Sequence, residues 1–256
     1  MAMGVPPTAY DRAAIIFSPE GDLYQVRYAF EAVRKGWTSL GLRTKEVVIL
    51  AAEKRKLSPL LDIADIEKIY KVDDHVGVAF AGMGSDGRVL IDYARLVAVR
   101  HRLLYGEPPT IEYLSKTIAD LKQVYTQHGG VRPFGVSLIL GGVNPDGTTR
   151  LFRTDPGGQY FSYYAVAIGL GESYVNDFFE KHYKPDLDLD SLIKLTIKAL
   201  FESRVKGGEE KPEILLKELH NMVEIGYIKR DEKLFKKMTP DEIRKYVDEI
   251  SGELAG

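Results

Sequence analysis

The chain is organised around a stretch near its N-terminus, residues 10–33, which reads YDRAAIIFSPEGDLYQVRYAFEAV. Its apolar run at 13–17 is short enough to pair as a single β-strand. Pro19 restricts its own φ and Gly21 permits a tight reversal, so residues 18–21 are predicted to form a turn. We therefore expect a strand and a turn to precede the first helix.

A helix is expected to follow this turn. Asp22 is a suitable N-cap, because its side-chain oxygen can accept a hydrogen bond from a backbone N–H of the first helical turn. Apolar residues then recur at helical spacing, at Val26, Ala29, Phe30 and Val33. Gly36 is expected to end the helix, since glycine readily adopts the left-handed conformation found there. No residue pattern within 10–33 is typical of an active site.

The composition argues against several classes of function. The chain has 256 residues, of which 45% are hydrophobic and 28% charged, as is ordinary for a soluble globular protein. A net charge of −2 argues against electrostatic binding of nucleic acid, which needs a surplus of lysine and arginine. The absence of cysteine removes disulfides, thiolate metal sites and a cysteine nucleophile together.

Neither a membrane span nor a secretory signal is predicted. No apolar run approaches the roughly 18 residues that a transmembrane helix requires. The first residues, MAMGVPP, lack the basic and apolar regions of a signal peptide. We therefore expect a cytoplasmic protein that binds neither membranes nor nucleic acid, with a mobile tail over residues 1–12.

The remainder of the chain is divided into blocks of strands and blocks of helices. Strands are predicted over 37–43, 46–53, 66–70 and 75–82. Two helices follow, over 85–105 and, with Thr110 as N-cap, over 111–125. Further strands are predicted over 134–143, 149–154 and 160–168, the first two joined by a turn at 144–147. Helices over 173–183 and 191–205, strands over 220–228 and 233–237, and a terminal helix from Thr239 and Pro240 complete the chain.

This order favours a layered α/β fold. The strands and helices come in separate runs rather than as alternating βαβ units, which is typical of two antiparallel sheets layered with helices. No low-complexity linker divides the chain. We therefore expect one domain over residues 1–256.

The sequence Gly169-Leu170-Gly171 follows a predicted strand and precedes a predicted helix, as a dinucleotide-binding loop would. The fingerprint of such loops requires a third glycine or alanine where Tyr174 stands, together with a surrounding βαβ unit. Both are missing. A plain strand-to-helix turn is therefore the better interpretation, and a nucleotide-binding protein is a remote alternative.

Metal and acid chemistry have little support in the sequence. The five histidines show no close metal-ligand spacing, and no serine stands in a GxSxG motif. The acidic pairs Asp73-Asp74 and Asp188, Asp190 fall in predicted loops without a convergent partner, so we interpret them as solvated carboxylates. We expect neither a metal nor a cofactor.

The sequence Gly147-Thr148-Thr149 could in principle expose a threonine nucleophile. Threonine hydrolases of this type are cut after a glycine, and the new α-amino group then acts as the general base on the hydroxyl. A cut here would discard more than half of the chain and split a predicted hairpin. We therefore interpret the sequence as the exit of a turn.

The stretch 10–33 resembles the N-terminal signature of proteasome α-type subunits. The similarity lies in YDR at 10–12, FSPEG at 17–21, LYQV at 23–26 and YA at 28–29, and continues through EAV at 31–33. A second block, YTQHGGVRPFGVS at 125–137, resembles archaeal α subunits in particular. DPGG at 155–158 and AVAIG at 165–169 match further landmarks, and Phe30 and Trp37 resemble crenarchaeal chains.

The resemblance implies a four-layer αββα sandwich, the α+β fold of the N-terminal-nucleophile hydrolases. It also implies a homo-heptameric outer ring of α subunits, stacked on a ring of proteasome β subunits that begin with a threonine nucleophile. A helix over 22–35 would provide ring contacts and cover the end of the sandwich at which a β subunit has its active site. The resemblance therefore implies a non-catalytic subunit without cofactors, which gates substrate access to the proteolytic chamber.

The roles of single residues follow from the matched motifs. The residues that resemble the family's gate cluster, which holds the N-terminal tails in an open arrangement, are Tyr10, Asp11, Arg12, Pro19 and Tyr28. Lys68 matches the pocket lysine that receives the C-terminal carboxylate of an activator, expected to be a ring ATPase unfoldase ending in hydrophobic-Tyr-X. Gly21 and Arg27 are assigned to the same pocket. The loop that narrows the channel for unfolded protein substrates corresponds to His128, Gly129 and Gly130.

One residue departs from the family pattern. The position of Arg27 is usually acidic in the family, so the pocket is expected to be more positive here. This change could tighten carboxylate docking or disturb ring contacts, and the sequence leaves both open. The rival interpretation of the whole chain is a self-processing N-terminal-nucleophile hydrolase that acts independently.

Overall fold

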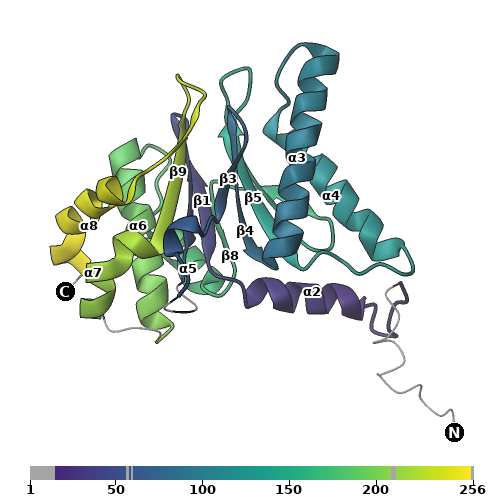
Figure 1. Ribbon diagram of the computed structural model, residues 1–256, viewed down its shortest axis with the longest axis horizontal. Coiled ribbons are helices and arrows are strands. Elements are labelled where there is room, and N and C mark those ends of the chain that lie inside the picture. The colour runs from purple at the N-terminus through teal and green to yellow at the C-terminus, as the bar shows by residue number, and fades with distance from the viewer. Residues whose placement is uncertain (1–14, 56–57, 59, 209–211, 255–256) are drawn as a thin grey trace, which may run out of the picture.

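The computed structural model of the chain describes residues 15–55, 58, 60–208 and 212–254. Two five-stranded antiparallel sheets face one another, and helices cover the outer face of each (Figure 1). The layers therefore run helices, sheet, sheet, helices. This arrangement confirms the four-layer αββα sandwich that the resemblance implied.

The first sheet has the strand order β10-β9-β2-β1-β8. Its strands are β1 (Ser39–Arg43), β2 (Val47–Glu53), β8 (Ala165–Ile168), β9 (Val223–Lys229) and β10 (Phe235–Lys237). The second sheet has the order β3-β4-β5-β6-β7. Its strands are β3 (Ile69–Asp73), β4 (Val76–Gly82), β5 (Val136–Val143), β6 (Thr149–Thr154) and β7 (Tyr160–Ser162).

Helices on both sides give the sheets two buried faces. The second sheet is covered by α3 (Gly84–Tyr105) and α4 (Ile111–Gln127), and the first by α5 (Glu172–His182), α6 (Leu189–Lys206), α7 (Pro212–Met222) and α8 (Pro240–Leu254) (Figure 1). A 3₁₀ turn, Ile63–Asp65, precedes β3. Every residue of β2 and β5 is buried, which explains why these strands read as continuous apolar runs rather than as alternating ones.

Side-chain caps fix the ends of two helices as predicted. The Thr110 hydroxyl accepts a hydrogen bond from the Tyr113 N–H at 3.1 Å, which places Thr110 at the N-cap of α4. At α8, the Glu242 N–H donates to the Thr239 hydroxyl, and the Thr239 N–H donates back to the Glu242 carboxylate at 2.7 Å. This reciprocal pair is a capping box, and it sets the start of the last helix.

Helix α2 (Tyr24–Arg34) closes one end of the sandwich and belongs to neither outer layer (Figure 1). Its Val33 is 1% exposed and packs into the core between the two sheets. Gly36 follows the helix as predicted, but without the left-handed φ expected there. A Cβ at this position would instead lie 2.2 Å from the Gly82 nitrogen at the end of β4. Only glycine permits this close approach, which holds the C-terminal end of α2 against the end of the second sheet.

The entry to α2 differs from the prediction. Residues 15–17 form no strand, and their side chains are exposed. Leu23, not Asp22, stands at the N-cap. The reason is that Asp22 belongs to the preceding turn: its N–H donates to the Ser18 hydroxyl at 3.2 Å and its carbonyl accepts from the Ser18 N–H at 2.9 Å.

The segment 160–168 supplies two strands, as predicted, and the chain crosses at Tyr163 and Tyr164 from β7 in the second sheet to β8 in the first. Another prediction was wrong. Residues 220–222 end helix α7 rather than start a strand, and the amphipathic helix buries Leu215 and Leu219. Of the helices formed by the described residues, none combines the length and apolar character needed to cross a bilayer.

Candidate functional site

The turn before α2 is closed by its own hydrogen bonds. The Gly21 N–H donates to the Ser18 carbonyl at 2.9 Å, and Gly21 has a φ of 86°, in the left-handed region that favours glycine. Ser18 is buried beneath the turn, whereas Pro19 is exposed at its surface. The predicted turn at 18–21 is therefore confirmed, and it presents Pro19 to the outside.

The outer face of α2 carries Tyr28 of the predicted gate and Arg27 of the predicted pocket. Tyr28 is 49% exposed, and its ring centroid lies 6.4 Å from that of Tyr24. The Arg27 guanidinium forms an ion pair with the Asp22 carboxylate at 2.9 Å and lies 5.7 Å from the centroid of the Tyr24 ring. The unusual cation is thus held by an acid of the same chain, five residues earlier.

Three predicted gate residues, Tyr10, Asp11 and Arg12, lie outside the described residues, as does the predicted tail over 1–12. Their assignment to a gate therefore stays a prediction. The structure places only Pro19 and Tyr28 of that cluster, the first in the turn and the second on α2.

Lys68 is the most deeply buried residue of the predicted site, with 5% of its surface exposed. It immediately precedes β3, and its backbone N–H donates to the Glu224 carboxylate at 2.9 Å. Its ammonium lies 3.8 Å from the centroid of the Phe80 ring and 5.8 Å from that of Trp37. Two aromatic faces therefore support the cation, an arrangement worth more when water is excluded.

Burial lowers the pKa of Lys68 to about 8, and the negative charges of Glu224 and Glu53 offset this only in part. Within the described chain, no carboxylate oxygen lies at ion-pair distance from the Lys68 ammonium. Glu224 is instead paired with Lys237 at 2.6 Å. The site is thus a desolvated lysine whose close contacts are aromatic rings, and it has the chemistry to bind an external anion.

Within a single chain, the structure does not bring Lys68 together with Gly21. Trp37, which contacts the Lys68 ammonium, follows α2, whereas Gly21 precedes it. An 11-residue helix spans about 16 Å, so the two residues lie at opposite ends of α2. A pocket that contains both would have to be built from two copies of the chain.

The predicted channel loop begins where α4 ends. His128 is the C-cap residue of α4, and its Nδ1 lies 2.8 Å from the Val124 carbonyl oxygen. Gly129 and Gly130 are exposed, and Gly130 has a φ of 86°. The three residues therefore form an exposed tip that turns on a left-handed glycine.

The patterns interpreted as ordinary structure are part of the framework. Gly169-Leu170-Gly171 is the turn between β8 and α5, where the Gly171 N–H donates to the Thr38 hydroxyl at 3.1 Å. The Thr148 hydroxyl donates to Asp146 at 2.7 Å inside a hairpin turn. No cluster of three or more histidine, aspartate or glutamate side chains suited to a metal ion occurs in the described part of the chain.

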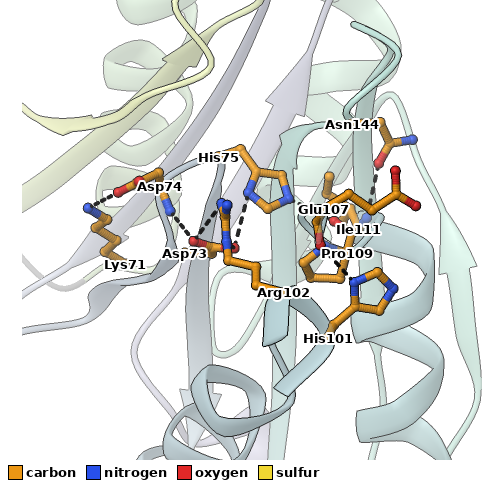
Figure 2. A network of polar contacts seen from close by, with 10 residues as sticks. All are labelled: Lys71, Asp73, Asp74, His75, His101, Arg102, Glu107, Pro109, Ile111 and Asn144. Atoms are coloured by element: carbon orange, nitrogen blue, oxygen red, sulfur yellow. Dashed lines mark hydrogen bonds and ion pairs between the residues drawn. The ribbon is translucent and has the colours of Figure 1, made fainter. Parts of the chain in front are cut away.

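The interpretation of the first acidic pair as solvated carboxylates was wrong for Asp73 (Figure 2). Its side chain is 13% exposed and accepts two hydrogen bonds from Arg102 of α3, at 2.8 and 3.0 Å. His75 lies beside it and contacts the Pro109 carbonyl through Nε2 at 2.7 Å. Asp73 thus ties the β3–β4 turn to α3.

The second acidic pair also has structural roles. The Asp188 carboxylate accepts from the Ser191 N–H at 2.9 Å and caps α6, while Asp190 accepts from the Tyr246 hydroxyl at 2.6 Å. These partners lie in α6 and α8. Neither carboxylate is part of the candidate site.

Sequence reasoning missed two acidic residues that contact the site. Glu224, which binds the Lys68 backbone, is 156 residues away in β9, and no local signal could have paired the two. Asp86 accepts hydrogen bonds from Arg132 at 2.7 and 2.8 Å, next to the channel loop. Its place in the first turn of a predicted helix, where a carboxylate is favoured, was the one signal available.

Known protein families match the chain over most of its length. The family described as the N-terminal signature of the proteasome A-type subunit matches residues 10–32, and the family described as "Proteasome subunit" matches residues 33–211. The chain belongs to the proteasome α-subunit family. The first match spans the turn and most of α2, and the second spans most of both sheets.

Curated members of the family are similar over nearly their whole length. A proteasome alpha subunit from Aeropyrum pernix is 62% identical over 256 residues, which is 99% of each chain. One from Sulfolobus acidocaldarius is 55% identical over 94% of this chain and 97% of the relative. One from Saccharolobus solfataricus is 52% identical over 98% of this chain and all of the relative. The predicted family and its crenarchaeal character are confirmed.

Proposed function

We propose that this chain is the non-catalytic α subunit of a proteasome core particle. It forms a homo-heptameric outer ring, gates the access of unfolded proteins to the chamber of the β subunits, and docks the C-termini of a ring ATPase that supports ATP-dependent protein degradation. A cytoplasmic location is part of the proposal. The observation that carries it is the position of α2, whose Val33 fills the end of the core between the sheets.

The hydroxyl groups near that end support a non-catalytic role. Thr38 and Ser39, at the start of β1, are 1% and 0% exposed. The Thr38 hydroxyl accepts from the Gly171 N–H at 3.1 Å, and the Ser39 hydroxyl donates to the Phe80 carbonyl at 2.7 Å. A nucleophilic threonine needs a free α-amino group and access to substrate. These two hydroxyls are interior to the chain and already hydrogen-bonded.

A ring of identical copies would complete the activator pocket. Because Lys68 and Gly21 lie at opposite ends of α2, the pocket is assembled from Lys68 of one copy and the Ser18–Gly21 turn of the next. Contacts of this head-to-tail type close into a ring when the rotation between copies allows it. The exposed face of α2, with Tyr28 and Arg27, supplies the remaining surface of the contact.

Lys68 supports the proposed docking of a C-terminal carboxylate. A desolvated ammonium that rests on Phe80 gains a charge-assisted hydrogen bond when a carboxylate arrives, and such bonds are about twice as strong as neutral ones. A tail ending in hydrophobic-Tyr-X offers that carboxylate together with an apolar anchor. Arg27 is engaged by Asp22, so its extra charge acts on the pocket only from a distance.

The gate and the constriction complete the proposal. Residues 1–12, with Tyr10, Asp11 and Arg12, form tails at the ring centre, and Pro19 and Tyr28 hold them through contacts between neighbours. Tails that bury little surface are reordered at small cost in free energy. Below them, the loops of His128, Gly129 and Gly130 narrow the channel so that only unfolded chains pass.

Assembly with β subunits tests the proposal. The purified chain is examined by size-exclusion chromatography and negative-stain imaging, alone and mixed with β subunits, and peptide hydrolysis is measured in each sample. We expect a discrete ring, no hydrolysis by the chain alone, and hydrolysis once β subunits are present. A chain that stays monomeric and never joins β subunits would contradict the proposal.

The same preparation separates the proposal from an independent, self-processing hydrolase. Such an enzyme must be cut before a serine or threonine, so the mass of the mature chain would be reduced. We expect mass spectrometry to find residues 1–12 intact in the assembled particle. A nucleotide-binding role is tested at the same time, because we expect no shift in melting temperature on addition of nucleotides.

A further inference from the structure

The channel loop is fastened at its base to the first turn of α3. Arg132 donates two hydrogen bonds to the Asp86 carboxylate, Nη1 to Oδ2 at 2.7 Å and Nη2 to Oδ1 at 2.8 Å. The Gly135 N–H donates to the same Oδ2 at 2.9 Å. One carboxylate therefore holds the loop at two positions, three residues apart.

Asp86 is buried and ionised at a fixed position in α3. It is 7% exposed and lies in the first turn of α3, where the helix dipole favours a negative charge. Burial alone would raise its pKa, but the hydrogen bonds from Arg132 and Gly135 outweigh it and hold the pKa below its usual value. Its partner Arg132 is exposed instead of buried, with 55% of the side chain exposed. The buried acid thus fixes an arginine that reaches in from the loop.

The tip of the loop has no packing of its own to fix it. A Cβ at Gly129 or Gly130 would meet nothing within 4 Å. On the side of α4, the last polar contact before the tip is the one between His128 Nδ1 and the Val124 carbonyl oxygen. On the strand side, the first polar contact with another element, among the residues described, is the one between Arg132 and Asp86.

We propose that Asp86 and Arg132 are positioning residues, which fix the loop of His128, Gly129 and Gly130 and thereby set the width of the channel. The inference rests on the proposed function for its consequence in the ring, but the anchoring itself belongs to the single chain. A bidentate pair fixes the orientation of the guanidinium as well as its distance. In a ring of identical copies, a small shift of this loop occurs in every copy, so the width of the channel changes by the sum of all the shifts.

Two conservative variants test the anchoring in the intact chain. Arg132→Lys keeps the charge but loses the bidentate geometry, and Asp86→Asn keeps the shape but loses the charge. We expect amide hydrogen exchange at Gly135, whose N–H donates to Asp86, to become about tenfold faster in both, since hydrogen bonds to charged groups contribute that much to local stability. Lys116→Ala is the matched control, because it removes an exposed ion pair with Asp120 on α4.

The consequence for the channel is measured in assembled particles that lack residues 1–12, so that the gate does not limit access. We expect both variants to change the rate at which an unfolded protein is degraded by at least about twofold, with hydrolysis of a short peptide unchanged. The Lys116→Ala control should leave both rates at the wild-type value. A change confined to the bulky substrate is not expected from a general loss of stability, which would lower both rates.

The outcomes distinguish this inference from the proposed function. Unchanged exchange at Gly135, or an unchanged ratio of the two degradation rates, would overturn the positioning role. Failure of the wild-type chain to assemble with β subunits would instead overturn the proposed function. The exchange measurement on the single chain would still decide whether Asp86 anchors the loop.

Discussion

The Lys68 ammonium lies 3.8 Å from the centroid of the Phe80 ring, in a place where only 5% of the lysine is exposed. Phe80 belongs to β4 and Lys68 immediately precedes β3, so two neighbouring strands of one sheet hold the contact. A buried cation supported by π faces has lost much of its hydration but keeps its charge. In the proposed function, this cation receives the carboxylate of a docking partner.

Replacement of Lys68 by methionine is expected to abolish stimulation by an ATPase activator. Methionine has a similar length and packs against Phe80, so the fold is retained, but the charge that binds a carboxylate is lost. Activator affinity should fall by about tenfold or more, since a charge-assisted hydrogen bond is removed. Peptide hydrolysis with and without the activator measures the effect, and basal hydrolysis should be unchanged.

Lys71→Met is the matched control for this experiment. Lys71 lies three residues further on in β3, is exposed and pairs with Asp74 at 2.5 Å. The control should respond to the activator as the wild type does. If stimulation survived in Lys68→Met, or were lost equally in Lys71→Met, Lys68 would not be the docking residue.

Docking is expected to weaken as the pH rises through about 8. Burial lowers the pKa of Lys68 to about 8, so the ammonium loses its proton just above neutral pH and no longer attracts a carboxylate. Stimulation is compared with basal hydrolysis between pH 7 and pH 9. A Lys68→Arg particle, whose guanidinium stays charged, should show a flatter profile, whereas equal profiles for both would contradict the assignment.

The stability of the chain is expected to fall on acidification, because of His75 (Figure 2). Burial lowers the pKa of His75, and the hydrogen bond to Pro109 and the charge of Asp73 offset this only in part, while Arg102 lowers it further and Asp74 raises it. The unfolded chain therefore takes up the proton first, and stability is lost as the pH falls below about 6.5.

Chemical denaturation at pH 7 and pH 5 measures this loss, which cannot exceed about 1.4 kcal/mol per pH unit from one group. His75→Gln keeps a donor toward the Pro109 carbonyl but cannot be protonated, so its stability should depend less on pH. His182→Gln, at an exposed position, is the control. A His75→Gln chain with the pH dependence of the wild type would show that other groups dominate.

Much of the fold could be predicted because local signals agreed with it. The strand at 149–154, the cap at Thr110 and the start of α8 at Pro240 rest on turn and cap residues that act within a few positions. The division of segment 160–168 between two sheets could not be predicted, because it is decided by partners far away in sequence. Asp22 was wrongly predicted as the N-cap of α2, because Ser18 holds its backbone in the preceding turn and Arg27 binds its carboxylate.

In the candidate site, too, features set by local residues could be predicted and features set by distant partners could not. The turn with Gly21 follows from glycine itself, and the structure confirms it. The burial of Lys68 could not be seen in the sequence, because Phe80 and Glu224 come from other strands. The first acidic pair was misjudged for the same reason, since the partner of Asp73 is Arg102 on another element.

The most direct test of the gatekeeper role is hydrolysis of a short peptide by particles assembled from β subunits and either the full chain or a chain lacking residues 1–12. No activator is added, and the chain alone is assayed beside them. We predict no hydrolysis by the chain alone and faster hydrolysis by the particle without the tails. Equal rates for the two particles, or hydrolysis by the chain alone, would contradict it.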